Sequence, residues 1–272
     1  MGEELLHLLQ YLFLGALQGF TEPIPISSSG HVVIAGEIMN VKSEGLGFET
    51  LVNFASLIAV LIIYRRDLID LTTHSIGYVF KGNKAYKKDF MFVVYLLLAT
   101  IPAGAIGLLL EDFITNTLSE EMKVIGTTLI ITAIALYIIR NLKGHKGDHQ
   151  ISWKDALIVG LAQSVALIPG ISRSGATIVA AMALGMKQQT ALKFSFFLYI
   201  PISVGSMILE GSEIVTNENL SAIWIPYAIA FIASLIASYF SLRWFMGIMA
   251  KGNLIIFSIY CFIVGTAVIL FL

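Results

Sequence analysis

The chain has 272 residues, of which 57% are hydrophobic and 13% charged, and its mean hydropathy is +0.84. A soluble domain is typically about a quarter charged, so this composition excludes a water-soluble globule. The 17 basic residues are balanced by 18 acidic ones, for a net charge of −1, and no basic excess is available to bind a nucleic acid backbone. The single cysteine, Cys261, excludes an internal disulfide and a cysteine-rich metal site. The composition predicts a membrane protein that does not bind nucleic acid.

In chain order, the apolar segments are one interrupted stretch, three continuous runs, a second interrupted stretch and three further runs. A bilayer core of about 30 Å needs roughly 20 apolar residues in a helix, so each continuous run predicts a transmembrane helix. The runs are 49–64, which is short, 90–110, 121–140, 190–209, 222–242 and 253–272. Continuous apolar runs favour helices over a barrel, in which apolar and polar residues alternate. The fold class is therefore an all-α polytopic membrane protein.

The two interrupted stretches, residues 5–36 and 155–186, are broken near their middles by proline, glycine and serine. Each predicts a re-entrant helical hairpin that enters the membrane and turns back. Non-helical backbone at membrane depth is tolerated only where protein or a water-filled cavity receives it. We therefore expect the two breaks to meet inside the protein and to line a site.

Basic residues are concentrated in alternate loops, which orients the chain because short cytoplasmic loops retain lysine and arginine. With two re-entrant hairpins, 14 of the 17 basic residues fall on one side, which should be the cytoplasmic side. They are Arg65, Arg66, Lys81, Lys84, Lys87, Lys88, Arg140, Lys143, Lys146, Lys154, Lys187, Lys193, Arg243 and Lys251. The opposite loops carry Glu111, Asp112, Glu120, Glu121, Glu210, Glu213 and Glu218. Both termini and the opening of the site are predicted to be extracytoplasmic.

An internal repeat relates the two halves of the chain. Shifting the sequence by 145 residues aligns a G-x-x-Q pattern followed by I-S-x-S-G, from Gly15 to Gly30, with the same pattern from Gly160 to Gly175. Within a single membrane domain, 1–272, we expect a first repeat at 1–140 and a second at 150–272. Each holds one hairpin and three spans, and because three is odd the second copy is inverted. Sites in such proteins lie between broken helices near the midplane.

Three ionisable residues, Glu22, His31 and Arg173, fall inside the hairpins. A charge at membrane depth costs at least ~2.5 kcal/mol, so it indicates function; the alternative is a structural ion pair between Glu22 and Arg173. Arg173 follows a Pro-Gly turn at an expected helix start, where free N–H groups, hydroxyls and a guanidinium suit a phosphate. The expected substrate-binding residues are Ser27, Gln163, Ser172, Ser174, Gly175 and Thr177.

The first hairpin offers a complementary set of groups. Gln18 and Glu22 are four residues apart and share one helix face. Ser28 precedes His31 by three residues on a helix start, so the pair is geometrically able to act as nucleophile and base. Serine-rich turns also cap helices, and an isolated histidine is often structural.

Three motifs resemble those of the undecaprenyl-diphosphate phosphatase family, also known as the bacitracin-resistance phosphatases. They are Gln18-Gly19-Phe20-Thr21-Glu22, Pro25-Ile26-Ser27-Ser28-Ser29-Gly30-His31 and Pro169-Gly170-Ile171-Ser172-Arg173-Ser174-Gly175. The likeness extends over nearly the whole chain. It implies hydrolysis of a polyprenyl diphosphate to the monophosphate, which recycles the lipid carrier for cell-envelope glycan synthesis.

The resemblance also implies roles for individual residues. Glu22 matches the second acid of the family's E/Q-x-x-x-E motif, Ser28 the nucleophilic serine, His31 its neighbouring histidine and Arg173 the arginine that clamps the diphosphate. Many members have glutamate where this chain has Gln18. Glu22 and Gln18 are the expected ligands of a divalent metal, Mg²⁺ or Ca²⁺, because both ions take oxygen ligands.

The residues leave two mechanisms open. Ser28 attacks and a phosphoserine is hydrolysed, or water attacks directly with His31 or Glu22 as base. Two rival functions are a flippase for polyprenyl phosphate, because inverted repeats with broken helices are typical of transporters, and an ion-coupled carrier of small anions. The expected partners are the membrane and the polyprenyl diphosphate lipid, and the sequence leaves a homo-oligomer open.

Overall fold

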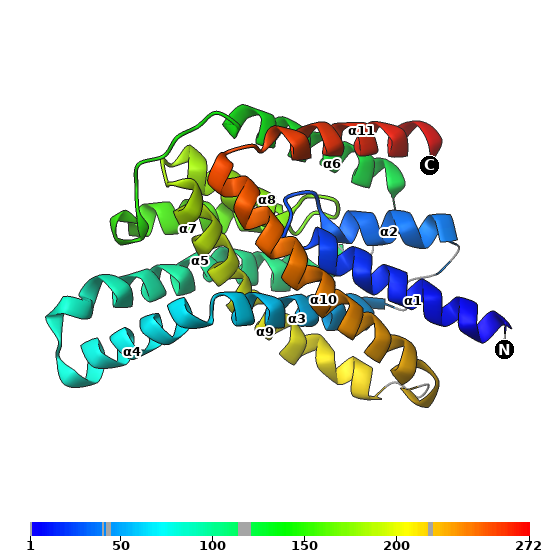
Figure 1. The fold of residues 1–272 in the computed structure, drawn as a ribbon, viewed down its shortest axis with the longest axis horizontal. Helices are drawn as coiled ribbons and strands as arrows, with labels where there is room; N and C mark the ends of the chain where they lie inside the picture. The colour runs from blue at the N-terminus through cyan, green and yellow to red at the C-terminus, as the bar shows by residue number, and fades with distance from the viewer. Residues whose placement is uncertain (1, 40, 42–44, 114–120, 217–219) are drawn as a thin grey trace.

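The computed structural model describes residues 2–39, 41, 45–113, 121–216 and 220–272 (Figure 1). Across these residues the regular elements are helices, with one isolated β-bridge between Lys146 and Met186. The α-helices are α1 (Gly2–Thr21), α2 (Ser28–Met39), α3 (Gly45–Ile63), α4 (Arg65–Lys81), α5 (Lys87–Phe113), α6 (Met122–Ile139), α7 (Trp153–Val165), α8 (Arg173–Ala183), α9 (Gln188–Thr216), α10 (Leu220–Lys251) and α11 (Ile255–Phe271), with 3₁₀ turns η1 (Lys84–Tyr86) and η3 (Asp148–Gln150). The all-α prediction is confirmed.

Four described segments are long and apolar enough to cross a bilayer, namely Lys84–Leu109, Met122–Ile139, Gln188–Gly211 and Trp224–Lys251. They coincide with four of the six predicted runs. The run at 49–64 lies in α3, which meets α4 at a bend of 76°. Counting that bent pair as one span gives five, and α11 is a shorter apolar helix of 17 residues.

The outer surface of these helices is apolar and the interior contains many small polar side chains. Ile101, Ile138, Ile208, Phe240 and Ile263 are all more than half exposed. Extensive exposed apolar surface of this kind is rare in a soluble monomer. Serines 56, 234, 238, 241 and 258 are instead buried. This distribution fits a multi-pass membrane protein with lipid on the outside.

The helices pack in matched pairs. In Figure 1, α6 lies alongside α11, and α1 crosses α10. Contacts also join α7 to α5 and α3 to α9. α1 and α2 form one antiparallel hairpin, and α7 and α8 pack together as a second helix pair (Figure 1). Both interrupted stretches are therefore helix–turn–helix units packed against the longer helices.

Two glycines that the 145-residue shift aligns lie at close packing contacts between these helices. A Cβ added to Gly15 would lie 2.3 Å from the Ala230 carbonyl oxygen, and one added to Gly160 would lie 2.4 Å from that of Ala99. Backbone atoms cannot move aside as a flexible side chain can. Glycine is thus required where α1 meets α10 and where α7 meets α5.

Loops that carry basic residues are joined to one another. His149 Nε2 lies 2.7 Å from Asp89 Oδ1, and Lys193 Nζ lies 3.2 Å from Asp148 Oδ2. Lys193 also pairs with Asp67. These contacts, with the Lys146–Met186 bridge, bring the segments around residues 67, 89, 148 and 190 to one end of the molecule. Glu120 and Glu218, from the acidic loops, lie outside the described residues, as do the side chains of Glu111, Asp112 and Glu213.

We predict that Gly15→Ala and Gly160→Ala both lower the thermal unfolding midpoint of the protein in detergent. Overpacking costs about 1–3 kcal/mol, and the obstructing atoms here are backbone. Gly104→Ala on α5 is the matched control, because an added Cβ meets nothing within 4 Å there. Alanine is the better helix former by about 1 kcal/mol, so the control should be neutral or stabilised. A Gly15→Ala protein as stable as the control would contradict the contact with α10.

Candidate functional site

The first break follows α1. Pro23 and Pro25 have no N–H group to continue a helix, and α1 ends at Thr21. Ser27 has a φ of +68°, unusual for a residue other than glycine. Its hydroxyl accepts a hydrogen bond from the Gly30 N–H at 3.3 Å, so Ser27 caps α2 and Ser28 becomes the first residue of that helix.

The second break follows α7 and is built in a similar way. Gly170 has a φ of +84°, and an added Cβ would lie 2.0 Å from the Thr128 hydroxyl oxygen. That hydroxyl donates to the Pro169 carbonyl at 2.9 Å, which ties the turn to α6. The Ser172 hydroxyl accepts from the Gly175 N–H at 3.0 Å, so Arg173 is the first residue of α8.

The two breaks lie against each other in the interior. The Ser174 hydroxyl donates to the Ile24 carbonyl at 3.3 Å, and a Cβ added to Gly30 would lie 3.3 Å from the Gly170 Cα. On the other side of the contact, a Cβ added to Gly175 would lie 3.4 Å from the Pro25 Cβ. The second turn thus satisfies a carbonyl of the first, and the first residues of α2 and α8 come together.

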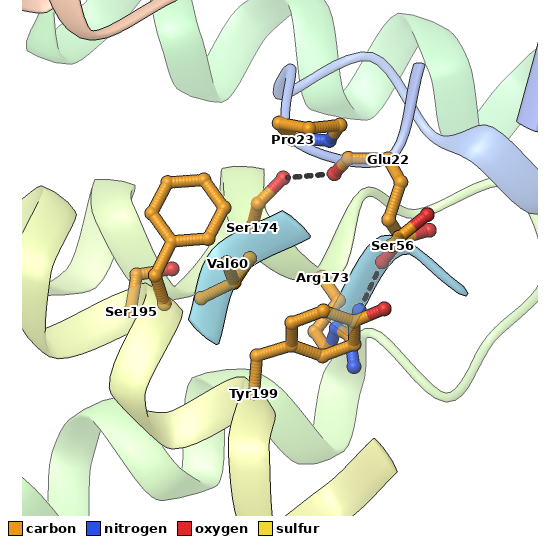
Figure 2. A pocket seen from close by; sticks show the side chains of 9 residues that line it. Glu22, Pro23, Ser56, Val60, Arg173, Ser174, Ser195 and Tyr199 are labelled. Atoms are coloured by element: carbon orange, nitrogen blue, oxygen red, sulfur yellow. Dashed lines mark hydrogen bonds and ion pairs between the residues drawn. The ribbon is translucent and has the colours of Figure 1, made fainter. Parts of the chain in front are cut away.

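Glu22 and Arg173 form a buried ion pair where the breaks meet (Figure 2). The Glu22 side chain is 8% exposed and that of Arg173 21%. One oxygen of Glu22 accepts from Arg173. The other accepts from Gln18 Nε2 at 3.0 Å and from the Ser28 hydroxyl. A carboxylate, a guanidinium and a serine hydroxyl therefore share one hydrogen-bonded cluster.

Tyr199 of α9 completes the surroundings of Arg173. The guanidinium carbon lies 3.9 Å from the centre of the Tyr199 ring. Figure 2 shows the two side chains next to each other. The Tyr199 hydroxyl bonds the Asn53 carbonyl on α3 at 2.6 Å. The cavity around this cluster is lined by Glu22, Pro23, Ser56, Val60, Arg173, Ser174, Ser195, Phe196 and Tyr199. Its volume is about 10 Å³, room for one water molecule.

His31 points away from this cluster. Its Nδ1 lies 2.7 Å from the Ser27 carbonyl oxygen, and its Nε2 lies 2.8 Å from the Tyr260 hydroxyl on α11. A carbonyl only accepts hydrogen bonds, so Nδ1 carries a proton, and in the neutral ring Nε2 accepts from the Tyr260 hydroxyl. In the structure His31 therefore bonds the Ser27 carbonyl and Tyr260 in place of Ser28. The Ser28 hydroxyl instead bonds the Glu22 carboxylate, because an ionised acceptor forms the stronger bond.

The donors around Gln18 suit a divalent cation. Gln18 is buried, and its Oε1 has no hydrogen-bond partner in the described structure. This carbonyl oxygen and the Glu22 carboxylate are hard oxygen donors of the kind that Mg²⁺ and Ca²⁺ prefer. Among the described residues no group of three or more His, Cys, Asp or Glu side chains is arranged around a metal position. In the structure the Gln18 amide nitrogen faces the Glu22 carboxylate, so the amide would have to turn over for both oxygens to hold one cation.

Comparison with known proteins shows the family of the chain. The family model described as "Bacitracin resistance protein BacA" matches residues 11–267. The chain belongs to this family. It is 57% identical over 270 residues to "Undecaprenyl-diphosphatase 1" of Bacillus cereus, covering 99% of this chain and 100% of the relative. It is also 57% identical over 266 residues to "Undecaprenyl-diphosphatase" of Oceanobacillus iheyensis, covering 97% of each.

The predicted residues of this BacA-family chain divide into three groups. Glu22, Ser28, Gln18, Arg173 and Ser174 lie together in or beside the cavity. Ser27, Ser172 and Gly175 make helix caps, and the Thr177 hydroxyl lies 2.6 Å from that of Ser195. Gln163 is buried, its Nε2 has no hydrogen-bond partner among the described residues, and it does not line the cavity.

Several residues of the site were not predicted from the sequence. Tyr199 and Ser195 lie one turn apart on α9, Ser56 is on α3, and Tyr260 is on α11. A tyrosine or serine within an apolar run is common and carries no signal on its own. The four-residue spacing of Ser195 and Tyr199 places them on one helix face, which is a weak indication of a shared role.

Proposed function

We propose that this chain is an integral membrane phosphatase that hydrolyses a polyprenyl diphosphate of the undecaprenyl type to the monophosphate and inorganic phosphate. The reaction recycles the lipid carrier for cell-envelope glycan synthesis. The observation that carries this proposal is the Glu22 carboxylate, bonded to both Arg173 and Ser28 at the meeting of two helix starts. Relatives that match nearly the full chain are named as undecaprenyl-diphosphatases. That agreement disfavours the flippase alternative.

The terminal phosphate would bind at the start of α8. The first N–H groups of a helix have no acceptor within the helix, and together with its dipole they bind anions. Arg173 can hold two phosphate oxygens with its planar guanidinium, and the Ser174 hydroxyl lines the same cavity. These donors would also stabilise the charge that develops during phosphoryl transfer.

Ser28 is the nucleophile in the route that the geometry favours. Because its hydroxyl already donates to Glu22, Glu22 is placed to take the proton as Ser28 Oγ bonds to the terminal phosphorus. The bridging P–O bond breaks and polyprenyl monophosphate leaves. Water then hydrolyses the phosphoserine and restores the hydroxyl. Direct attack by water with Glu22 as base uses the same residues and remains the alternative.

His31 then has a positioning role in place of the role of base. Its Nδ1–H holds the Ser27 carbonyl and its Nε2 accepts from Tyr260. It therefore fixes the turn that presents Ser28. A bound divalent cation would be held by Glu22 and Gln18 and would neutralise charge on the diphosphate. The terminal phosphate would still be bound by Arg173 and Ser174, and it would still be attacked by Ser28.

We further propose six membrane spans and two re-entrant hairpins, arranged as inverted repeats at 1–140 and 150–272. The paired packing supports this, because α1 of the first half packs on α10 of the second, and α7 of the second half packs in the same way on α5 of the first. Gly15 and Gly160 make equivalent backbone contacts, and Ser27 and Ser172 make equivalent caps.

The proposed orientation places the basic loops in the cytoplasm and both termini outside, with the site opening to the outside. Contacts of His149 with Asp89 and of Lys193 with Asp148 support a common side for three basic segments. Figure 1 shows both chain ends at the opposite end of the molecule from the α4–α5 connection.

Labelling of single cysteines tests the orientation. In a Cys261→Ala background, Lys84→Cys and Lys143→Cys should react with a membrane-impermeant maleimide only after the cells are opened. Glu121→Cys should react in intact cells. All three positions are exposed in the structure, so accessibility within the protein is matched. Equal labelling of Lys84→Cys and Glu121→Cys in intact cells would reject the proposed sides.

Phosphate release from undecaprenyl diphosphate by the purified chain in detergent tests the activity. Wild-type protein should release phosphate, and chelation of divalent ions should reduce the rate. Arg173→Lys should lose at least about 100-fold in turnover, because lysine is a point charge that cannot make the forked contact. Arg140→Lys is the control, since Arg140 also stacks on a tyrosine but lies in a basic loop. Near wild-type turnover in Arg173→Lys would contradict the forked contact with phosphate. Arg173 would then have only the structural role of pairing with Glu22.

The nucleophile is tested by comparing neighbouring serines. Ser28→Ala should reduce turnover by at least about 100-fold, on the scale of a lost nucleophile, while its folding is unchanged. Ser29→Ala is the matched control, because the Ser29 hydroxyl faces that of Ser27 at 3.5 Å and does not bond Glu22. Stereochemistry at a chiral terminal phosphorus gives an independent measure. Retention supports two displacements through Ser28, whereas inversion would assign the attack to water.

A further inference from the structure

A groove on the outer face of the α3–α10 pair carries two arginines from different helices. It is lined by Ile63, Arg65, Tyr239, Arg243 and Met246 and has a volume of about 270 Å³. Arg65 begins α4 directly after α3, and Arg243 lies near the end of α10. None of these residues lines the cavity around Glu22 and Arg173. The groove is therefore separate from the candidate active site.

The two guanidinium groups have most of their hydrogen-bonding capacity free. Arg65 Nη1 donates to the Ile62 carbonyl at 2.9 Å, and Arg243 Nη1 lies 3.5 Å from the Tyr239 hydroxyl. Neither arginine has a carboxylate within ion-pair distance in the described part of the chain. The nearby Asp67 pairs with Lys193 instead. Each guanidinium has five N–H donors, so both can still bind an anion.

The surroundings of the groove are those of a membrane surface. Ile62, Ile236 and Phe240, the neighbours of the groove on α3 and α10, are exposed apolar side chains. Ile63 and Met246 form apolar parts of its lining. Arg65 belongs to the basic end of the molecule, where the proposed topology places the cytoplasmic leaflet. An anion bound here would have hydrocarbon on one side and water on the other.

We propose that Arg65 and Arg243 form a binding site for the phosphate of an anionic lipid in the leaflet at the basic end. Tyr239 would donate its hydroxyl to the same headgroup, and the acyl chains would lie along Ile236 and Phe240. Arginine is suited to this task because its planar donors match two phosphate oxygens. Basic pockets between membrane helices on the cytoplasmic side are known to take anionic lipid headgroups.

Native mass spectrometry of the purified full-length chain tests the site without reference to turnover. The probes are palmitoyl-oleoyl-phosphatidylglycerol, the zwitterionic phosphatidylcholine with the same chains, and inorganic phosphate. Wild-type protein should bind phosphatidylglycerol at least tenfold more tightly than phosphatidylcholine. The doubly substituted Arg65→Gln/Arg243→Gln protein should lose that tenfold preference, equivalent to about 1.4 kcal/mol.

Arg140→Gln is the matched control, because Arg140 is a loop arginine whose Nη1 also donates to a backbone carbonyl and whose guanidinium lies over Tyr137. It should keep the preference. An equal loss of the phosphatidylglycerol preference in Arg140→Gln would show that basic residues attract anionic lipid in general, and it would overturn the site. An unchanged preference in the double variant would overturn it as well. Inorganic phosphate that displaces the lipid at equal concentration would assign the groove to free anions. If the double Gln variant is unstable, the double Lys variant should show an intermediate loss.

Discussion

Non-helical backbone can lie at membrane depth only if other protein groups satisfy its N–H and C=O groups, and most polar side chains around the two breaks have this function. Side-chain hydroxyls, and one histidine ring nitrogen, donate hydrogen bonds to backbone carbonyls. In a continuous helix these carbonyls would accept from backbone N–H groups. Losing one of these donors would leave a buried carbonyl unpaired, at a cost of about 1–3 kcal/mol. The pairs are Thr128 with Pro169, Ser174 with Ile24, Ser238 with Gly19, Ser241 with Phe20 and His31 with Ser27.

The ion pair between Glu22 and Arg173 depends on this framework. Removing two charges from water is expensive, and their attraction offsets that cost only with good geometry and further hydrogen bonds. Gln18 and Ser28 supply those bonds to Glu22, and the Tyr199 ring covers Arg173. A phosphate that reaches Arg173 must compete with Glu22 for the guanidinium. Binding of substrate would then release the carboxylate that holds the Ser28 hydroxyl.

Periodicity and charge in the sequence were sufficient for the helical class and for the position of both breaks, because prolines 23 and 25 and the Pro169-Gly170 pair end helices locally. The hydrogen-bond partners of the site residues could not be predicted from neighbouring sequence positions. The three-residue spacing of Ser28 and His31 predicted a contact that the carboxylate of Glu22 and the distant Tyr260 hydroxyl each replace. The bend after α3 was also missed, since Tyr64 is neither proline nor glycine.

The neutral Gln18 is consistent with the charge balance of this site. Its amide nitrogen lies 3.0 Å from Glu22, so a carboxylate in its place would put two negative groups in hydrogen-bond contact. Like charges that close raise the pKa of one member and keep it protonated unless a cation is present. With glutamine, the carboxylate of Glu22 pairs with Arg173 and has no second acid at position 18 beside it. The charge that a divalent cation must neutralise is then that of the diphosphate, which the unpartnered Gln18 carbonyl oxygen can help to coordinate.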